Sequence, residues 1–254
     1  MRLLIASGNE GKIGEIKQLL FDAMDDRSKG TTHPKEAVHP KDSGAISQNQ
    51  TWEILSLSDL EHLWKTETVG GLPPVSGDAA QIQSMIQSRY AELNERMEEK
   101  GSTFEENARF KALGAASYTG MLCLADDSGI EVDYLQGAPG VYSARYAGIQ
   151  GDDQANNALL LHNMRYASEH SRSARFRAVA VLADGEHVLH STTGVWEGSV
   201  GFFPKGDKGF GYDPLFIIAQ DGRTSAELSA EEKNAISHRG QAIREMVAWL
   251  ARTT

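Results

Sequence analysis

The sequence predicts a mixed α/β fold, in which helices and strands interleave along the chain. Some segments carry apolar residues at helical spacing, whereas others are short apolar runs or alternate with polar residues, as strands do. These two patterns follow one another from the N-terminus to the C-terminus, and no internal repeat is visible. The chain has 254 residues, of which 40% are hydrophobic, and this is enough for one sizeable core. We therefore expect a single domain over residues 1–254.

The first expected elements are a strand, a tight loop and a helix. The apolar run "RLLIA" at residues 2–6 predicts a short buried strand. A helix is predicted at residues 12–24, where apolar side chains recur at helical spacing. The residues expected on its buried face are Ile13, Ile16, Leu19, Leu20 and Met24.

Residues 25–95 are predicted to be an elaboration of the domain. Residues 25–49 are polar and contain several turn formers, which predicts a flexible surface insertion. The alternation in "TWEILSLSDL" predicts a strand at residues 51–60, and a polar helix is expected at residues 79–100 after the break "VGGLPPVSGD". The elaboration is therefore split around a strand.

The structural signals become denser after this elaboration. A helix is predicted at residues 103–120, with Lys111 among alanines on its apolar face and Gly120 as a helix stop. Apolar runs on both sides of "ADDSG" predict two strands around an acidic turn at residues 121–135. Residues 151–167 predict another helix, which has an acidic start.

The last third of the chain is expected to hold two paired strands and a closing helix. Alternating residues at 174–184 and 187–200 predict antiparallel strands around a turn at Gly185. Residues 229–250 predict one helix, for which Ser229 is the N-cap and a glutamate stands at capping-box spacing.

Composition and charge narrow the possible partners. The formal net charge of −10 disfavours a general nucleic-acid-binding surface, which needs clustered Lys and Arg. A small anionic substrate remains compatible, if a local basic pocket and a divalent metal hold it. Cys123 is the one cysteine, so no intrachain disulfide can form, and a reducing, cytoplasmic compartment is expected. No apolar run approaches the roughly 18 residues that cross a bilayer, so no membrane role is expected.

The stretch "SGNEGK", Ser7 to Lys12, stands where the first strand gives way to the helix. Glycines let backbone N–H groups approach a ligand, a helix N-terminus favours negative charge, and Lys12 adds a cation. These features predict triphosphate binding. The stretch is not a Walker A loop, because its glycines are too close together and Ile13 stands where Ser or Thr would meet magnesium. A tight turn with a surface lysine is the plainer alternative, and this stretch alone does not decide between the two.

The stretch "ADDSG", Ala125 to Gly129, places two adjacent acids between apolar runs. Adjacent carboxylates repel each other unless a cation uses them, and a hard divalent metal prefers oxygen ligands. A carboxylate beside bound water can also act as a general base. The alternative is an acidic β-turn without a site. Ser128 is a weak candidate for a nucleophile, because the surrounding sequence is not G-x-S-x-G.

Two later stretches could form the rest of a nucleotide site. In "KGFGYDP", Phe210 and Tyr212 stand among glycines, and an aromatic ring there could stack on a base. In "EEKNAISHRG", Lys233, Ser237 and His238 are close enough on one helix to present donors to a phosphate or a base. Aromatic packing in a loop and a solvated polar helix face are the respective alternatives.

These stretches occur together and in order, and the sequence resembles the inosine triphosphate pyrophosphatase family through "SGNEGK", "ADDSG…GAPGVYSARYAG", "GFGYDP" and "EEKNAISHRG". The enzymes of this family hydrolyse non-standard purine nucleoside triphosphates such as those of inosine, deoxyinosine and xanthosine. The resemblance covers residues 1–24 and about 98–252. It implies an elongated, two-lobed protein with a twisted mixed sheet, a central substrate cleft and a homodimeric state.

The resemblance also implies the roles of individual residues. Asp127 matches the general base and a metal position, and Lys12 matches a catalytic cation. Glu98 matches a second Mg²⁺ position, although the register leaves Glu99 as an alternative. The substrate-binding positions implied by the resemblance are Ser7, Gly8, Asn9, Glu10, Gly11, Lys12, Ser128, Phe210, Gly211, Tyr212, Asp213, Lys233, His238 and Arg239.

The implied reaction is hydrolysis between the α and β phosphates, which gives a nucleoside monophosphate and pyrophosphate and clears the nucleotide pool. The sequence departs from the family between Lys12 and Glu98, where it is much longer, and the two extra segments are expected to lie outside the cleft. One rival hypothesis is a related pyrophosphatase that acts on modified pyrimidine nucleotides, which "SHRG" and "FGYDP" disfavour. Another is a nucleotide-binding regulator without catalysis, against which the intact Asp127 and Lys12 argue.

Overall fold

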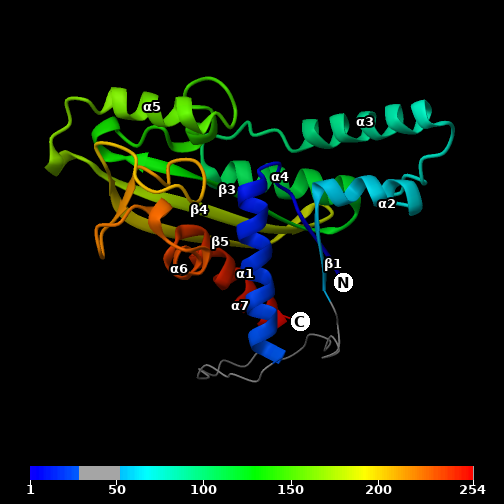
Figure 1. Cartoon of the computed structure of the whole chain (residues 1–254). Coiled ribbons are helices and arrows are strands. Elements are labelled where there is room, and N and C mark those ends of the chain that lie inside the picture. The colour runs from blue at the N-terminus through cyan, green and yellow to red at the C-terminus, as the bar shows by residue number, and fades with distance from the viewer. Residues whose placement is uncertain (29–51, 254) are drawn as a thin grey trace.

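A six-stranded mixed sheet crosses the computed structural model, which describes residues 1–28 and 52–253 (Figure 1). The strand order is β2-β1-β3-β4-β5-β6. The pairs β2–β1 and β1–β3 are parallel, and every later pair is antiparallel. The strands are β1 (Arg2–Ile5), β2 (Glu53–Ser56), β3 (Leu122–Val132), β4 (Ser173–Asp184), β5 (His187–Val200) and β6 (Phe216–Ile218).

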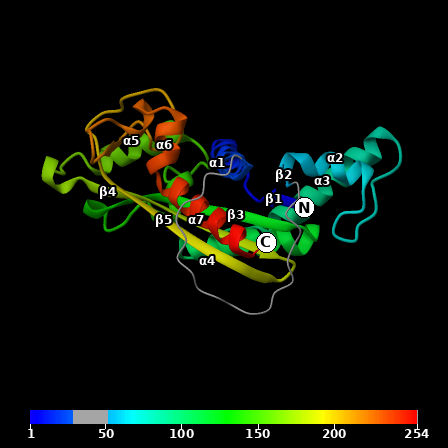
Figure 2. The same ribbon diagram turned by 90° about the horizontal axis from the view of Figure 1, so that it is seen from below.

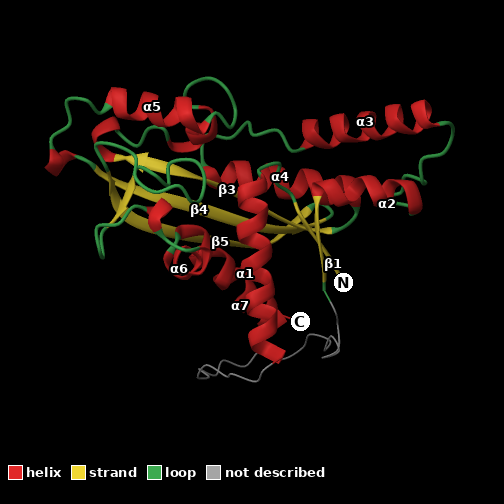
Figure 3. Cartoon of the chain, viewed as in Figure 1, coloured by secondary structure: helices red, strands yellow, loops and turns green. Residues whose placement is uncertain are grey.

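The helices are distributed along this sheet and at both of its ends (Figure 3). They are α1 (Glu10–Ser28), α2 (Leu60–Thr66), α3 (Ala79–Arg96), α4 (Phe104–Thr119), α5 (Asp153–Asn163), α6 (Ala230–Ile236) and α7 (His238–Thr253). Figure 2 shows α5 and α6 grouped at one end of the molecule and α2 and α3 at the other, with α1 between them. The interleaved order confirms the mixed α/β class.

The two faces of the sheet bury separate apolar cores. Alternate residues of a strand point to opposite faces, and β1 shows this directly: Leu4 joins the core under α4, whereas Leu3 and Ile5 join the core under α1 and α7. A third core lies at the α5 end of the sheet, around Phe216. The central strands are therefore covered on both sides, which holds the middle of β3 rigidly between α1, α4 and α7.

Several expectations from the sequence are confirmed. The helix expected at residues 103–120 is α4, whose predicted apolar face is buried and whose C-cap is Gly120 in the left-handed conformation. The two alternating segments form the antiparallel hairpin β4–β5 around Gly185. Ser229 caps α6 in a complete capping box.

Two expectations are wrong. Residues 121–135 do not form two strands around an acidic turn: β3 runs unbroken, and its acids Asp126 and Asp127 pair with Ala180 and Val179 of β4. The charges are tolerated there because cations from three helices neutralise them, as described below. The closing segment is likewise two helices, α6 and α7, because the backbone turns to an extended conformation at Ser237.

The elaboration adds β2, α2 and α3 at one end of the sheet. β2 is shorter than the predicted strand and passes directly into a 3-10 turn and α2. The indole of Trp64 packs edge-on against Tyr90 of α3, with 4.8 Å between the ring centroids, and against Tyr118 of α4, at 6.4 Å. Of the insertion expected at residues 25–49, α1 takes the first part, and the remainder lies outside the described residues. No helix in residues 1–28 or 52–253 is long and apolar enough to cross a membrane.

Candidate active site

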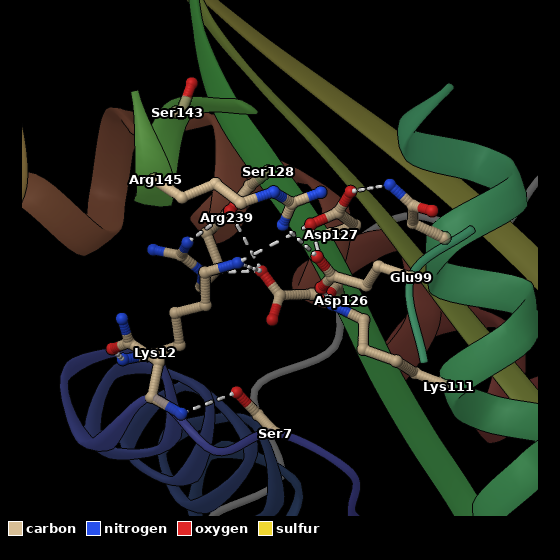
Figure 4. A network of polar contacts seen from close by, with 12 residues as sticks. Ser7, Lys12, Glu99, Lys111, Asp126, Asp127, Ser128, Ser143, Arg145 and Arg239 are labelled. Atoms are coloured by element: carbon tan, nitrogen blue, oxygen red, sulfur yellow. Dashed lines mark hydrogen bonds and ion pairs between the residues drawn. The ribbon is translucent and has the colours of Figure 1, made fainter. Parts of the chain in front are cut away.

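Four sequence motifs that are far apart along the chain meet around two adjoining cavities. The loop before α1, the middle of β3 and the start of α7 converge in Figure 4, where Lys12, Asp126, Asp127 and Arg239 point toward one another. One cavity, of about 340 Å³, contains Asp127 and is called the phosphate cavity below. The other is lined by residues 210–213, Lys233 and the start of α7, among others, and is called the base pocket.

The loop at residues 7–12 is shaped as an anion site. The side chain of Asn9 accepts a hydrogen bond from the backbone N–H of Lys12 (3.0 Å), and the Asn9 N–H donates to Ser7 Oγ (3.2 Å). These bonds fix the turn into α1, whose positive end then faces the phosphate cavity. Gly8 and Glu10 are exposed, so the loop is open to solvent on its outer side.

Asp126 is fully buried and neutralised by two cations. Its Oδ2 lies 3.5 Å from Lys12 Nζ and accepts hydrogen bonds from Arg239 Nε (3.2 Å) and Ser128 Oγ (3.2 Å). Burial alone would raise the pKa of this carboxyl, but the charges of Lys12 and Arg239 hold the pKa well below its usual range. Its Oδ1 has no hydrogen-bond partner among the described residues. Asp126 is therefore a permanent anion that orients Lys12 and Arg239.

Asp127, the next residue, has a different environment. It faces the phosphate cavity, where its carboxylate accepts a hydrogen bond from Asn107 Nδ2 (3.1 Å) and lies 3.5 Å from Lys111 Nζ. Burial raises the pKa of Asp127, and the positive charges of Lys111 and Lys12 offset this only in part. Of the two neighbouring acids, Asp127 is thus the better proton acceptor, and it is the one that opens onto a cavity.

These acids belong to a chain of alternating charges that links the two cavities. Lys233 Nζ lies 2.5 Å from Asp213 Oδ2 and 2.7 Å from Glu15 Oε1, and Glu15 also pairs with Arg239. At the other end, Lys111 Nζ lies 2.8 Å from Glu99 Oε1. We call the whole set the ion-pair chain; in order, it comprises Asp213, Lys233, Glu15, Arg239, Asp126, Lys12, Asp127, Lys111, Glu99 and Arg145.

Glu99, rather than Glu98, meets the phosphate cavity at Asp127. Glu98 is exposed and pairs with Lys100 (2.8 Å). The Glu99 carboxylate and Asp127 both contact the ammonium of Lys111, so a cation already lies between these two acids. Of the two glutamates that the sequence left open, the structure therefore brings Glu99 and not Glu98 toward Asp127, and which of them holds a metal stays a prediction.

A hard divalent cation fits this pair of carboxylates. No group of three or more His, Cys, Asp or Glu side chains that could hold a metal ion exists within residues 1–28 and 52–253. Two carboxylates are nevertheless what Mg²⁺ commonly takes from a protein, because water and substrate phosphates supply its other oxygen ligands. Asp127 and Glu99 form such a donor set beside the loop at residues 7–12.

The base pocket is covered by an aromatic ring and lined by cations. Phe210 packs over Gly11 so closely that a Cβ built on Gly11 would lie 2.6 Å from Phe210 Cδ1. The ammonium of Lys233 is 4.9 Å from the centroid of the Phe210 ring, and the guanidinium of Arg239 is 5.5 Å away. The loop at residues 208–213 therefore closes directly onto the first turn of α1.

His238 forms part of the back wall of the base pocket. Its ring stacks on Phe176, with 4.8 Å between the centroids and 9° between the planes. Burial lowers the pKa of His238 well below its ordinary value, and the nearby Arg239 and Lys233 lower it further. The imidazole is therefore neutral, and its Nδ1 has no hydrogen-bond partner in the described part of the chain.

Two of the residues expected to bind the base have their polar groups engaged elsewhere. The Tyr212 hydroxyl donates to the backbone carbonyl of Ser143 (2.9 Å). The Asp213 carboxylate accepts from Lys233 Nζ, from the Phe210 N–H (2.9 Å) and from Ser225 Oγ (2.9 Å). Tyr212 and Asp213 therefore hold the loop in place, and Asp213 has no unused oxygen to read a base.

A family model described as "Ham1 family" matches residues 74–249, more than half of the chain, and this match includes every motif above except the first. The chain belongs to the Ham1 family. Among curated Ham1 relatives, a protein of Exiguobacterium sp. named dITP/XTP pyrophosphatase is 52% identical over 151 residues, which are 59% of this chain and 76% of the relative. A Streptococcus mutans protein of the same name is 48% identical over 161 residues, but these span only 49% of its length. These matches confirm the resemblance seen in the sequence.

Solved structures of Ham1 proteins share the fold along the whole chain. A HAM1 protein from Coxiella burnetii has a TM-score of 0.67 and 31% identity over 99% of both chains. A nucleoside-triphosphatase described as a dITP/XTP pyrophosphatase, from Mycobacterium abscessus, has a TM-score of 0.60 and 33% identity and covers 98% of this chain and 97% of that one. The mixed α/β architecture is therefore that of the Ham1 family.

The sequence did not single out several charged residues of this Ham1 site. Glu15 lies three residues after Lys12, one turn along α1, and joins Lys233 to Arg239. Lys111 did carry a signal: a lysine at a core-facing position among alanines is rarely buried without a partner. Asn107 and Arg145 gave no signal of comparable strength, because their partners are remote in the sequence. Asp126 was noticed as one of two adjacent acids, but its pairing with Lys12 and Arg239 was not.

The end of α3 approaches the site. Asn94 and Met97 line a cavity with Ser7, Gly8 and Glu99. Asn94, near the end of α3, therefore lies next to the site, but no residue of α3 lines the phosphate cavity or the base pocket, and the expectation that both extra segments lie outside the cleft stays a prediction. Asn94 lies there because α3 packs along α4, which carries the end of α3 back toward Glu99.

Proposed function

We propose that this protein is a nucleoside triphosphate pyrophosphatase that hydrolyses non-standard purine nucleotides, namely ITP, dITP and XTP, to the monophosphate and pyrophosphate. The observation that carries the proposal is the ion-pair chain, because it joins the two cavities. On the side of the phosphate cavity it includes Lys12, at the start of α1, and Asp127. On the side of the base pocket it includes Lys233, which lies beside the ring of Phe210. A nucleoside triphosphate has the corresponding parts in the same order. The names of the curated Ham1 relatives support the substrate class.

The loop at residues 7–12 would bind the triphosphate. Lys12 is half-buried and lies 3.5 Å from Asp126, and burial lowers the pKa of Lys12, an effect that the charge of Asp126 opposes. A phosphate oxygen offers Lys12 a second anion at short range, while the helix terminus supplies backbone N–H donors. The internal ion pair thus holds Lys12 in position before the substrate arrives.

Asp127 and Glu99 would hold Mg²⁺ on the phosphate cavity. The bound metal would neutralise phosphate oxygens and so lower the cost of developing charge. When it binds, Lys111 would keep Glu99 and Asp127 in place from behind, since its ammonium also donates to the backbone carbonyl of Asp126 (2.6 Å). The chain supplies one carboxylate from β3 and the other from the loop between α3 and α4.

Asp127 would act as the general base. It accepts a proton from the water that attacks the α-phosphorus; a bond forms between the water oxygen and phosphorus, and the bond to the α–β bridging oxygen breaks. Asn107 Nδ2 binds Oδ2 of the Asp127 carboxylate, and Oδ1 lies 3.5 Å from Lys111 Nζ, so both contacts orient the carboxylate in the cavity. Lys12 and the backbone N–H groups of the loop would stabilise charge on the departing pyrophosphate. No covalent intermediate is needed.

The base pocket would select a purine that carries an oxygen at C6. Phe210 would stack on the base. The neutral His238 has one N–H, and because its Nδ1 is enclosed by protein, the group that could reach a base is Nε2; with the proton there it can donate to O6 but opposes the amino group of adenine. A donor left unpaired in a dry pocket costs roughly 1 to 3 kcal/mol, which is about tenfold to a hundredfold in selectivity.

A substrate panel tests this function. The purified protein would be incubated with Mg²⁺ and, separately, the triphosphates of inosine, xanthosine, adenosine and guanosine, and kcat/KM would be measured from pyrophosphate release. We expect inosine and xanthosine triphosphates, which carry an oxygen at C6, to exceed adenosine triphosphate by about tenfold or more. Guanine carries the same oxygen, so the guanosine triphosphate arm measures whether the pocket reads a further group of the base. Equal values for all four would contradict the proposed selectivity, and a rate independent of Mg²⁺ would contradict the metal assignment.

Three further expectations remain predictions: a homodimer, a cytoplasmic location and a role in clearing the nucleotide pool. The one free thiol is consistent with a reducing compartment, since Cys123 is buried and burial raises its pKa to about 12. Light scattering coupled to size exclusion checks the dimer.

A further inference from the structure

Helix α5 forms two hydrogen bonds to one residue, Gly211, of the loop that covers the base pocket. The N–H of Gly211 donates to Asp153 Oδ2 (2.6 Å), and the carbonyl of the same residue accepts from Asn157 Nδ2 (2.8 Å). Asp153 and Asn157 are four residues apart on α5, so they lie on the same face of the helix. Both backbone polar groups of Gly211 are therefore bound by one helix.

These two hydrogen bonds orient two peptide groups at once. A peptide unit is planar and its N–H and C=O point in opposite directions. Fixing the N–H of Gly211 toward α5 therefore turns the carbonyl of Phe210 away from α5, and fixing the Gly211 carbonyl turns the N–H of Tyr212 away as well. Phe210, Gly211 and Tyr212 all line the base pocket.

The loop needs these hydrogen bonds because its backbone is in an uncommon conformation. Gly211 has a φ of 62°, in the left-handed region that glycine tolerates best. A glycine loses more conformational freedom on ordering than any other residue, so an unheld loop would sample many orientations. Asp213 fixes the loop from within, through the N–H of Phe210, but it does not contact either polar group of Gly211.

Neither side chain forms another hydrogen bond or ion pair among the described residues, although Asp153 also lines the base pocket and stands in the first turn of α5. The helix N-cap role belongs to Asp152, which accepts from the N–H of Ala155 (2.9 Å). Asn156, the neighbour of Asn157, binds the backbone at Ala147 (2.7 Å) instead. Within the described residues Asp153 forms no ion pair, so its charge is directed to the N–H of Gly211 alone.

We propose that Asp153 and Asn157 are positioning residues for base recognition, which act through Gly211 and set the selectivity between bases rather than the chemical step. This inference rests on the proposed function. Neither residue belongs to the ion-pair chain, and α5 contributes no residue to the phosphate cavity among those described. Loss of these two hydrogen bonds should therefore weaken the discrimination between bases and leave kcat, the rate at saturating substrate, unchanged.

Kinetics of four α5 variants test the inference. Asp153→Ala removes the acceptor, and Asn157→Asp places an acceptor against the Gly211 carbonyl at unchanged size. Asp153→Asn keeps a neutral acceptor and should rescue most of the effect. Gln154→Ala, at an exposed position of the same helix, is the control. We expect the first two to lower the ratio of kcat/KM for ITP to that for ATP by about tenfold, the value of one lost hydrogen bond, with kcat for ITP nearly unchanged.

A second measurement separates this inference from the proposed function. Hydrogen exchange of the Gly211 amide, followed by NMR without substrate, should be faster by about tenfold or more in Asp153→Ala and unchanged in Gln154→Ala. Unchanged exchange in Asp153→Ala would contradict the role of the hydrogen bond from Gly211 to Asp153, whether or not the protein is an active enzyme. Faster exchange with an unchanged ITP-to-ATP ratio, or an equal loss of kcat on both nucleotides, overturns the positioning role. A wild-type protein that hydrolyses none of the triphosphates overturns the proposed function instead.

Discussion

Asp126 and Asp127 are adjacent residues of one strand, yet the structure gives them opposite chemical characters. Cations on two helices keep Asp126 ionised, whereas burial makes Asp127 the more basic of the pair. The difference arises because Asp126 lies closer to Lys12 and accepts a hydrogen bond from Arg239, whereas Asp127 opens onto a cavity beside a neutral amide and two lysines at 3.5 and 4.0 Å. One strand thus supplies both an orienting anion and a proton acceptor.

The neutral state of His238 should appear in the pH dependence of stability. Because its pKa is lowered in the folded protein, the unfolded chain binds a proton below about pH 6.5 that the folded protein does not take up. Stability is therefore lost as the pH falls below this value. In denaturant titrations from about pH 7.5 to about pH 5, the free energy of unfolding should fall more steeply for wild type than for His238→Gln, by up to about 1.4 kcal/mol per pH unit. Equal slopes would contradict a buried neutral His238.

The choice between two neighbouring glutamates can be tested with a matched pair of variants. Glu99 faces Asp127 through Lys111, whereas Glu98 is exposed and pairs with Lys100. Glu99→Gln should raise the Mg²⁺ concentration that gives half-maximal rate by about tenfold or more, a typical loss when the support of a metal site is removed. Glu98→Gln should leave it unchanged. The reverse result would move the metal to Glu98.

At the scale of elements, α1 contributes to both halves of the site. Its first turn carries Lys12 toward the phosphate cavity, and one turn later Glu15 reaches Lys233 and Arg239 beside the base pocket. Gly11, also in the first turn, lets Phe210 pack against the helix. Displacement of this helix end would therefore disturb phosphate binding and base recognition together.

Two glycines of α1 provide a direct test of the contact with Phe210. A Cβ on Gly11 would lie 2.6 Å from Phe210 Cδ1, so Gly11→Ala should displace the ring and lower kcat/KM for ITP by about tenfold, the loss expected from one disturbed contact of this size. Gly14 has no atom within 4 Å of its added Cβ. Gly14→Ala should therefore keep the kinetics and stabilise the helix by up to about 1 kcal/mol. Unchanged kinetics in Gly11→Ala would show that the ring position is not critical.

The order and type of most elements could be predicted from the sequence, because periodicity is a local property. Two places are exceptions: the acidic segment of β3, and the break between α6 and α7. "ADDSG" was interpreted as a turn because two adjacent acids inside a strand are unfavourable in isolation, and the arginine that makes them tolerable is 113 residues away from Asp126. The break between α6 and α7 at Ser237 was missed because "EEKNAISHRG" has helical composition throughout.

The candidate site could be predicted in part, for the same reason. Residues with a conspicuous local context, such as Lys12 after its glycines and Phe210 between glycines, were identified from the sequence and lie in the cavities. Glu15, Asp153 and Asn157 were missed, because their partners Lys233 and Gly211 lie more than fifty residues away along the chain. Such partners become visible only once the sheet and its helices are assembled.

At the scale of the whole molecule, the site lies at the N-terminal end of α1, and Ser28, the last residue described before the first extra segment in the sequence, is at the other end of this helix (Figure 1). The 19 residues of α1 separate the two ends by about 28 Å at 1.5 Å per residue. Deleting residues 29–46 should therefore leave kcat/KM for ITP unchanged. A folded deletion variant that has lost turnover would show that this segment contributes to the site.

The central claim is that Asp127 activates water for attack between the α and β phosphates. The most direct measurement is the product of ITP hydrolysis in the presence of Mg²⁺, with pyrophosphate and orthophosphate measured separately, for wild type and Asp127→Asn. We predict inosine monophosphate and pyrophosphate in equal amounts from wild type and a kcat lower by about a hundredfold to ten-thousandfold in the variant. Orthophosphate as the product, or a variant as fast as wild type, would contradict this account.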